Sequence, residues 1–346
     1  MSNYTINGII IIVQGDEGMG SFEYKNLIEK RKMSMESLKK YNRELRKYEC
    51  ENNIPVKGIE IRKKIYKLIQ FILKIDRLLN KRTLTIVGDK RKPTNKTRIY
   101  AATHIGRYDI ESAIEAIGEA TWFIMGDPGE TYRNIDGVLL RAHGVSWFDM
   151  EDKYDAHIVN ERQKQILNAG GNELCFPEAA WNIDPLLPVM DIHPGIVKRA
   201  IKTNSVIIPI AIEQYYKNNR LNYFVNIGET LDYTGADIST ATSIASEIKT
   251  HMATLRWEIW EKHGQCSRKD MVSDWETGYE EFIESIMKDS ENGYTIEEIE
   301  KTRYTDPNKP IFEDPSEIFS HYENLEISKE TAFLAKDIVK AKKLTK

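Results

Sequence analysis

The 346-residue sequence is poor in cysteine, and it has no long apolar run and no internal repeat. Its three cysteines, Cys50, Cys175 and Cys266, are far apart and form no CxxC pair. This argues against a disulfide framework or a cysteine-based zinc site and fits a reducing compartment. The apolar run at residues 8–13 is too short for a signal peptide, and no segment approaches the roughly 18 apolar residues of a membrane span. We therefore expect a cytoplasmic protein.

The front and rear of the chain differ strongly in charge, although the net charge is only −4. Residues 1–100 contain 23 Lys and Arg against 11 Asp and Glu, whereas residues 270–330 contain 5 against 18. Such an asymmetry indicates an anionic partner for the basic part of the chain. With 41% hydrophobic and 29% charged residues, the composition is otherwise that of an ordinary globular protein.

Three regions are expected from the pattern along the chain. Residues 1–58 are charged and helix-prone, and Pro55 and Gly58 interrupt their pattern. Residues 59–264 contain a basic amphipathic helix followed by alternating strands and helices. Residues 265–346 are acidic and predict a helical extension laid on the surface.

Residues 59–82 predict a basic amphipathic helix. Its apolar residues recur at helical spacing, and lysines and an arginine fill most of the other positions. The apolar stripe consists of Ile61, Ile65, Leu68, Ile69, Ile72, Ile75 and Leu79. The helix either packs on the domain through this stripe or lies on an anionic membrane surface, and the two alternatives are compatible if the stripe serves both.

From residue 83 the pattern becomes that of an α/β protein. Strands are predicted at 84–88, 98–103, 121–125, 173–176, 205–212 and 222–228, and helices at 109–119, 153–169, 195–203 and 239–264. Strands that alternate with helices predict a mixed, mostly parallel sheet flanked by helices. The fold class is therefore α/β, with an N-terminal amphipathic helix and a helical C-terminal tail.

The pair His104 and Asp109 stands where a predicted strand ends and a helix begins. A histidine at a strand end and an aspartate in the next helical turn can form a general base that a carboxylate orients. Pairs with this spacing also arise by chance, so a purely structural role is the alternative.

Three further segments follow in a definite order. They are "GVLLRAHGVSWFD" at 137–149, "FPEAAW" at 176–181 and "MDIHPGIVKRAIKTNSVIIPIAI" at 190–212. Together with the His-x4-Asp pair, they resemble the four blocks of the glycerolipid acyltransferase superfamily, the group around lysophosphatidic acid acyltransferase. The resemblance covers roughly residues 60–262.

This resemblance implies the transfer of a fatty acyl group from a thioester, acyl-CoA or acyl carrier protein, to an acceptor hydroxyl. His104 would be the general base, Asp109 would orient it, and Glu178 would face the acceptor. The remaining residues expected at the substrate site are Gly106, Arg107, Arg141, Pro177, Trp181 and Asn182. No cofactor, metal or nucleic acid is expected. The protein would lie on an anionic membrane through residues 59–82.

The sequence departs from the family at two places where the family has arginine. Asp149 and Met150 end the second block, and Ala179, Ala180 and Trp181 follow Glu178. Those arginines bind the acceptor's phosphate through a rigid fork of donors, which methionine and tryptophan lack. The acceptor is therefore expected to be a lipid or glycoconjugate rather than a phosphomonoester, unless Arg107 or Arg141 supplies the charge.

Two alternatives remain at this stage. The first is a 1-acylglycerol-3-phosphate acyltransferase of phospholipid synthesis that uses other basic residues. The second is a catalytically inactive protein that binds lipid or acyl chains, against which the intact His104 and Asp109 pair argues.

Overall fold

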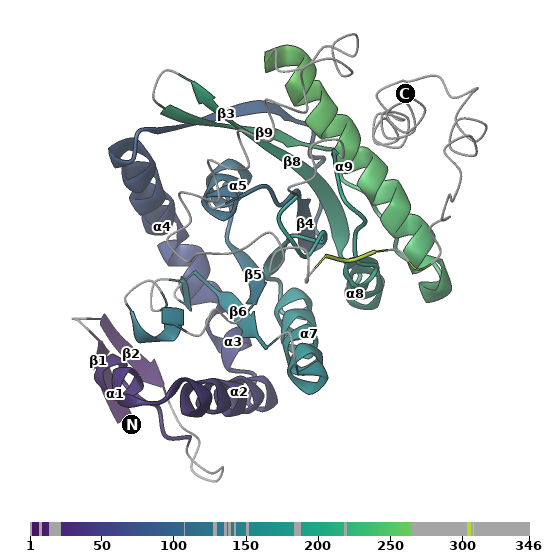
Figure 1. Ribbon diagram of the computed structural model, residues 1–346. Helices are drawn as coiled ribbons and strands as arrows, with labels where there is room; N and C mark the ends of the chain where they lie inside the picture. The colour runs from purple at the N-terminus through teal and green to yellow at the C-terminus, as the bar shows by residue number, and fades with distance from the viewer. Residues whose placement is uncertain are drawn as a thin grey trace, which may run out of the picture. The chain divides into compact units, whose positions relative to one another are not determined.

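The computed structural model describes most of the chain up to residue 263 (Figure 1). The described residues are 2–6, 9–13, 22–106, 108–126, 130–134, 137, 140–141, 143–149, 152–182, 188–217, 220–263, 303–305 and 307. They belong to two compact units, which are described separately. The smaller unit comprises Met1–Arg62 and Trp122–Ala169, and the larger comprises Lys63–Thr121 and Gly170–Lys346.

The larger unit is built on five neighbouring strands. They are β3 (Arg82–Asp89), β4 (Arg98–Ala102), β7 (Asn172–Cys175), β8 (Val206–Lys217) and β9 (Arg220–Ile227), in the spatial order β3-β9-β8-β4-β7. The pairs β3/β9, β8/β4 and β4/β7 are parallel, and only β8/β9 is antiparallel. The predicted mixed, mostly parallel sheet is thus confirmed. All seven residues 206–212 of β8 are buried and five of them are β-branched, as expected for a strand covered on both faces.

Helices cover this sheet on both sides. α5 (Asp109–Ile117) packs on β8 and β9, while α8 (Gly195–Thr203) and α9 (Ala241–His263) pack on β8 from the other side (Figure 1). α5 and α8 end where Gly118 and Asn204 take positive φ angles of 75° and 53°, the usual way to stop a helix. The strands and helices predicted between residues 98 and 264 are all present, and except for the end of β8 each limit lies within two residues of its prediction.

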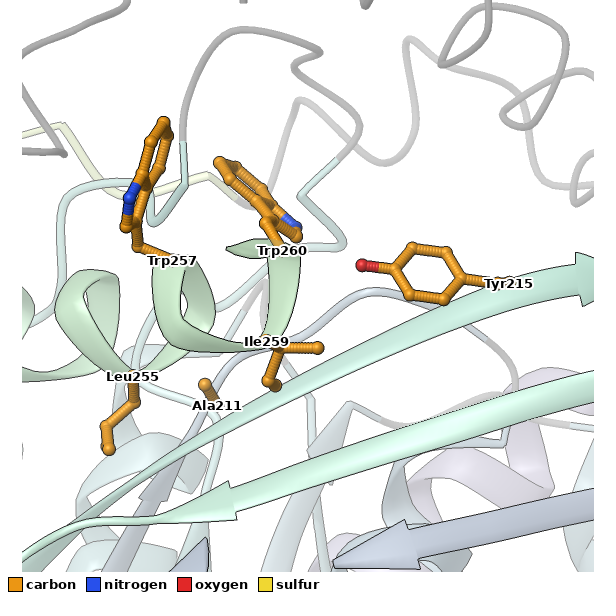
Figure 2. Close-up of a cluster of buried hydrophobic side chains, with 6 residues drawn as sticks. All are labelled: Ala211, Tyr215, Leu255, Trp257, Ile259 and Trp260. Atoms are coloured by element: carbon orange, nitrogen blue, oxygen red, sulfur yellow. The ribbon is translucent and has the colours of Figure 1, made fainter. Parts of the chain in front are cut away.

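The contact of α9 with β8 buries a cluster of large side chains (Figure 2). Ala211 and Tyr215 come from β8, and Leu255, Trp257, Ile259 and Trp260 come from α9. The indoles of Trp257 and Trp260 pack edge to face with their centroids 5.4 Å apart. Trp260 also donates its indole N–H to Glu213 Oε2 (2.6 Å), which further anchors α9 to the sheet.

The smaller unit holds the charged N-terminal part of the chain. β1 (Ser2–Ile6) and β2 (Ile9–Val13) form an antiparallel hairpin, and β5 (Thr121–Gly126) pairs in parallel with β6 (Val145–Phe148). Its helices are α1 (Leu27–Lys32), α2 (Met35–Glu51), α3 (Ile54–Lys57) and α7 (Lys153–Asn168), with a 3₁₀ turn, η1, at Glu130–Arg133.

Buried ion pairs join α2 to α7 within this unit. Arg46 donates to both carboxylate oxygens of Asp155 (2.9 and 2.7 Å), and Arg162 donates to Glu49 (2.9 Å). All four side chains are nearly inaccessible to solvent. Charged partners therefore occupy positions that apolar residues would otherwise fill, which explains the weak apolar periodicity of residues 22–50. The predicted boundaries after residues 58 and 264 stay predictions, and most of segment 265–346 lies outside the described residues.

The amphipathic helix is present as α4 (Ile59–Leu79), but its apolar stripe is not its packing face. Of the seven stripe residues only Ile69 is buried, and the other six are 40–78% exposed. The helix packs through the opposite side, where Tyr66 donates to the Ile114 carbonyl (2.9 Å) and Arg77 pairs with Glu115 (3.0 Å). The interpretation that the stripe packs on the domain is therefore wrong. No helix among the described residues is long and apolar enough to cross a bilayer.

Candidate active site

Of the predicted dyad, His104 lies on the loop from β4 to α5, and Asp109 is the first residue of α5. Nδ1 of His104 is 2.7 Å from Oδ2 of Asp109, which is fully buried. The same oxygen accepts the backbone N–H groups of Ile105 (2.8 Å) and Gly106 (3.1 Å). One carboxylate oxygen thus fixes both the imidazole and the turn. Arg107, predicted at the substrate site, lies outside the described residues.

This geometry leaves one nitrogen of the imidazole available for chemistry. A carboxylate only accepts hydrogen bonds, so Nδ1 of a neutral His104 carries the proton and Nε2 is the basic nitrogen. The side chain of His104 is 20% exposed. An imidazole held in this way can take a proton from a hydroxyl and can be stabilised by Asp109 when it becomes charged.

Glu178 lies beside the dyad because β4 and β7 are parallel neighbours. Their register pairs Ala101 with Cys175, so the residues that follow the two strands meet at the same edge of the sheet. Glu178 Oε1 accepts the backbone N–H of His104 (2.9 Å), and Oε2 accepts that of Met190 (2.7 Å). Burial raises the pKa of Glu178, while the two backbone hydrogen bonds and Arg256 oppose this. We expected a carboxylate facing the acceptor, but the structure buries it completely.

The rest of the third block surrounds the imidazole. The Phe176 ring lies 4.6 Å from the His104 ring, and the Trp181 indole lies edge-on at 6.1 Å. The backbone N–H of Asn182 donates to the His104 carbonyl (2.6 Å), and that of His193 donates to the Pro177 carbonyl (2.8 Å). Of the residues predicted at the site, His104, Gly106, Asp109, Pro177, Glu178, Trp181 and Asn182 are thus brought together.

Residues 83–213, which include this whole constellation, match the family model described as Acyltransferase. Among solved structures, the crystal structure of the 1-acyl-sn-glycerophosphate (LPA) acyltransferase PlsC from Thermotoga maritima is similar to this chain. The TM-score is 0.46 with 18% identity, over 60% of this chain and 84% of the other. Comparison with curated proteins gives no match. The family match bears out the predicted resemblance over residues 83–213, whereas the donor, the acceptor and the role of each residue stay predictions.

Ala179 departs from the family pattern, and its backbone conformation is strained. Ala179 stands where the family has glycine, and its φ angle is 61°, in the left-handed region. A residue with a Cβ atom is strained there by roughly 1–2 kcal/mol, whereas glycine is not. The chain therefore makes the turn after Glu178 with an alanine in a conformation that favours glycine.

Of the two arginines predicted to replace the missing charges, the structure describes only Arg141. Arg141 belongs to the smaller unit, where its guanidinium pairs with Glu49. Glu49 is buried and also binds Arg162 (2.9 Å). Met150 lies outside the described residues, and the backbone N–H of Asp149 donates to Asp155 (2.6 Å). A role of Arg141 toward the acceptor stays a prediction.

Two participants were missed by sequence reasoning. Phe176 contacts the imidazole ring, and Met190 acts through its backbone N–H. The position of Phe176 directly before Pro177 was a usable signal, but a backbone donor has no signature in the sequence. Among the residues that the structure describes, no group of three or more His, Cys, Asp or Glu is placed to hold a metal ion. Burial and the nearby Arg62 lower the pKa of His143 to about 4.

Proposed function

We propose that this protein is an O-acyltransferase that moves a fatty acyl group from a thioester, acyl-CoA or acyl carrier protein, to an acceptor hydroxyl. The observation that carries the proposal is the hydrogen bond from His104 to the buried Asp109, which leaves Nε2 as a base. The two residues lie within the segment that matches the acyltransferase family.

In the proposed reaction, Nε2 of His104 takes the hydroxyl proton as the oxygen attacks the thioester carbonyl carbon. A carbon–oxygen bond forms, and the carbonyl electrons move onto its oxygen to give a tetrahedral intermediate. The intermediate collapses, the carbon–sulfur bond breaks, and the imidazolium returns its proton to the departing thiolate. The products are an ester and a free thiol. Asp109 stabilises the imidazolium throughout and keeps Nδ1 as the donor.

The acceptor is proposed to be a lipid or glycoconjugate without a phosphomonoester. Trp181, half-buried and 6.1 Å from the His104 ring, offers a broad apolar face where the family has an arginine. An indole packs well on sugar rings and lipid chains. Each lost hydrogen bond to a charged group costs roughly 1.5–3 kcal/mol, and a phosphomonoester acceptor would bind correspondingly less well.

The enzyme is further proposed to work at an anionic membrane surface, which would supply a lipid acceptor. The exposed side of α4 combines the six exposed stripe residues with Lys63, Lys64, Lys67 and Lys74, all of which are exposed. An apolar face flanked by lysines is typical of helices that lie in the interface of an anionic bilayer.

Steady-state release of thiol from oleoyl-CoA, followed by mass spectrometry of the lipid product, tests the proposal. The acceptor panel contains lysophosphatidate, lysolipids that lack a phosphomonoester, and glycolipids, all presented in the same vesicles. We expect acceptor-dependent ester formation with the second and third classes. Efficient use of lysophosphatidate, at a kcat/KM of about 10⁴ M⁻¹s⁻¹ or more, would instead support a 1-acylglycerol-3-phosphate acyltransferase. Absence of thioester cleavage with every acceptor, from oleoyl-CoA and also from an oleoyl thioester of acyl carrier protein, would overturn the catalytic proposal.

A further inference from the structure

The backbone of His104 is held on both sides by the segment that follows β7. Its N–H donates to Glu178 Oε1 (2.9 Å), and its carbonyl accepts the N–H of Asn182 (2.6 Å). Because Asp109 holds the imidazole through Nδ1, backbone and side chain are fixed by different carboxylates. Loops alone seldom hold a catalytic group within the few tenths of an ångström that reaction requires, and such second supports provide the precision.

Glu178 is itself anchored in the interior. Its second oxygen accepts the N–H of Met190 (2.7 Å), on the segment whose Pro188 carbonyl accepts Nη1–H of Arg256 (2.7 Å). Arg256 is almost completely buried on α9 and pairs with Glu213 of β8 (2.9 Å). We call the hydrogen bonds from His104 and Met190 to Glu178 the clamp. Arg256 connects it to α9 and β8, which belong to the core.

No surface of Glu178 is available to a substrate. The residue is fully buried, and each carboxylate oxygen already accepts one backbone N–H. Because the carboxylate is fully buried, an acceptor hydroxyl could reach it only if the surrounding chain moved aside. At the end of the buried strand β7, Glu178 instead binds the backbone N–H groups of His104 and Met190.

We infer that Glu178 is a positioning residue that fixes the backbone of His104, and that it does not bind the acceptor. This inference rests on the proposed function of His104 as the base. The Glu178 carboxylate, by holding the backbone of His104, keeps the imidazole in line between Asp109 and the acceptor. Loss of the clamp therefore slows the chemical step for all acceptors alike.

Glu178→Gln tests the role with little change in size. The amide oxygen still accepts one N–H, but the NH₂ group faces the other N–H and that bond is lost. We expect kcat to fall by roughly 10–100-fold, the scale set by small misplacements of catalytic groups. The KM for the acceptor should stay within about twofold of wild type, and slow hydrolysis of the thioester by water should fall by the same factor as kcat.

An acceptor-binding role would give the opposite pattern. The KM for the acceptor would rise, while hydrolysis by water would be unchanged, because no acceptor takes part in it. Glu115→Gln is the matched control, since Glu115 is also a well-buried acid and its partner is Arg77 of α4. The control should match wild type in both rates. Glu178→Asp, which keeps the charge but is one carbon too short to reach both donors, replaces Glu178→Gln if that variant does not fold.

Nitrogen NMR of the His104 imidazole gives a readout that needs no turnover. Wild type should show one tautomer with the proton on Nδ1, and Glu178→Gln should show a mixture or a broadened signal, while Glu115→Gln should not. An unchanged His104 spectrum in Glu178→Gln would overturn the inference. If wild type cleaves no thioester but the spectrum responds to Glu178→Gln, the proposed reaction fails while the positioning of His104 stands.

Discussion

Oδ2 of Asp109 accepts three hydrogen bonds, one from Nδ1 of His104 (2.7 Å) and two from the backbone of the turn between them. The carboxylate is fully buried at the start of α5. It therefore sets both the direction of the imidazole and the path of the chain that carries it.

Asp109→Asn should impair catalysis severely while the protein stays folded. The amide keeps an acceptor for the turn, but it has no charge to stabilise an imidazolium and no longer enforces one tautomer. We expect kcat to fall by roughly 10²–10⁴-fold. Thiol release from oleoyl-CoA measures the rate, and circular dichroism checks folding. Asp232→Asn is the control. Asp232 follows Leu231, which pairs with Ile207 at the start of β8, the edge of the sheet opposite to His104. A folded Asp109→Asn variant with wild-type kcat would contradict the role of Asp109.

Ala179→Gly should stabilise the protein. The positive φ of 61° strains alanine by roughly 1–2 kcal/mol, and glycine removes this strain. The greater backbone entropy of glycine in the unfolded chain offsets about 0.5–1 kcal/mol of this gain. The free energy of unfolding should therefore rise by up to about 1.5 kcal/mol, measured by urea denaturation. Ala120→Gly serves as comparison, because Ala120 has no positive φ and should lose stability. A clear loss of stability in Ala179→Gly would show that the turn is not strained.

Glu111→Gln should remove a pH dependence of stability. Burial, together with the nearby Asp109, raises the pKa of Glu111 from 4.5 to about 7. The unfolded chain therefore ionises Glu111 first, and the wild-type protein loses stability as the pH rises from about 4.5 to 7. The shift corresponds to at most about 3 kcal/mol. Urea unfolding at pH 4.5 and pH 8 should show the variant gaining on wild type at the higher pH only. An equal difference at both values would mean that Glu111 ionises normally in the folded state.

Replacing Lys63, Lys64, Lys67 and Lys74 by Gln should release the protein from anionic vesicles. Each basic residue near such a surface contributes about 1 kcal/mol, so binding should weaken by roughly a hundredfold to a thousandfold at low salt. Co-sedimentation with vesicles, repeated at rising salt, measures it. Four exposed lysines outside α4, Lys32, Lys40, Lys47 and Lys92, provide a control with the same change in charge. Equal loss in both variants would point to net charge rather than to α4.

The sequence predicted the sheet of the larger unit well, because its strands are short apolar runs bounded by turn residues. The part of the sheet that the sequence did not predict depends on pairing between strands. β8 continues five residues beyond its predicted end at 212, through the polar Glu213 and Gln214, because β9 pairs with it along its length. β6, Val145–Phe148, was not predicted.

The candidate site was predictable in its residues but not in their contacts. The His104 and Asp109 pair has a spacing that a motif can reveal, whereas Glu178 binds backbone N–H groups that every residue possesses. Likewise, the pattern of α4 shows an apolar stripe but not the direction in which it faces. Tyr66 packs through a hydroxyl and Arg77 through its charge, and neither residue belongs to the predicted apolar stripe.

Thioester cleavage by His104→Ala tests the central claim most directly. The variant lacks Nε2, and its rate of acyl transfer should fall by roughly 10²–10⁴-fold or more. His251→Ala, a change at an exposed histidine on α9, should leave the rate unchanged. The measurement is thiol release from oleoyl-CoA with the best acceptor of the panel, with thermal melting to confirm that both variants are folded. Loss of transfer in the folded His104→Ala protein alone is the predicted result, and near-normal turnover by that protein would contradict the account.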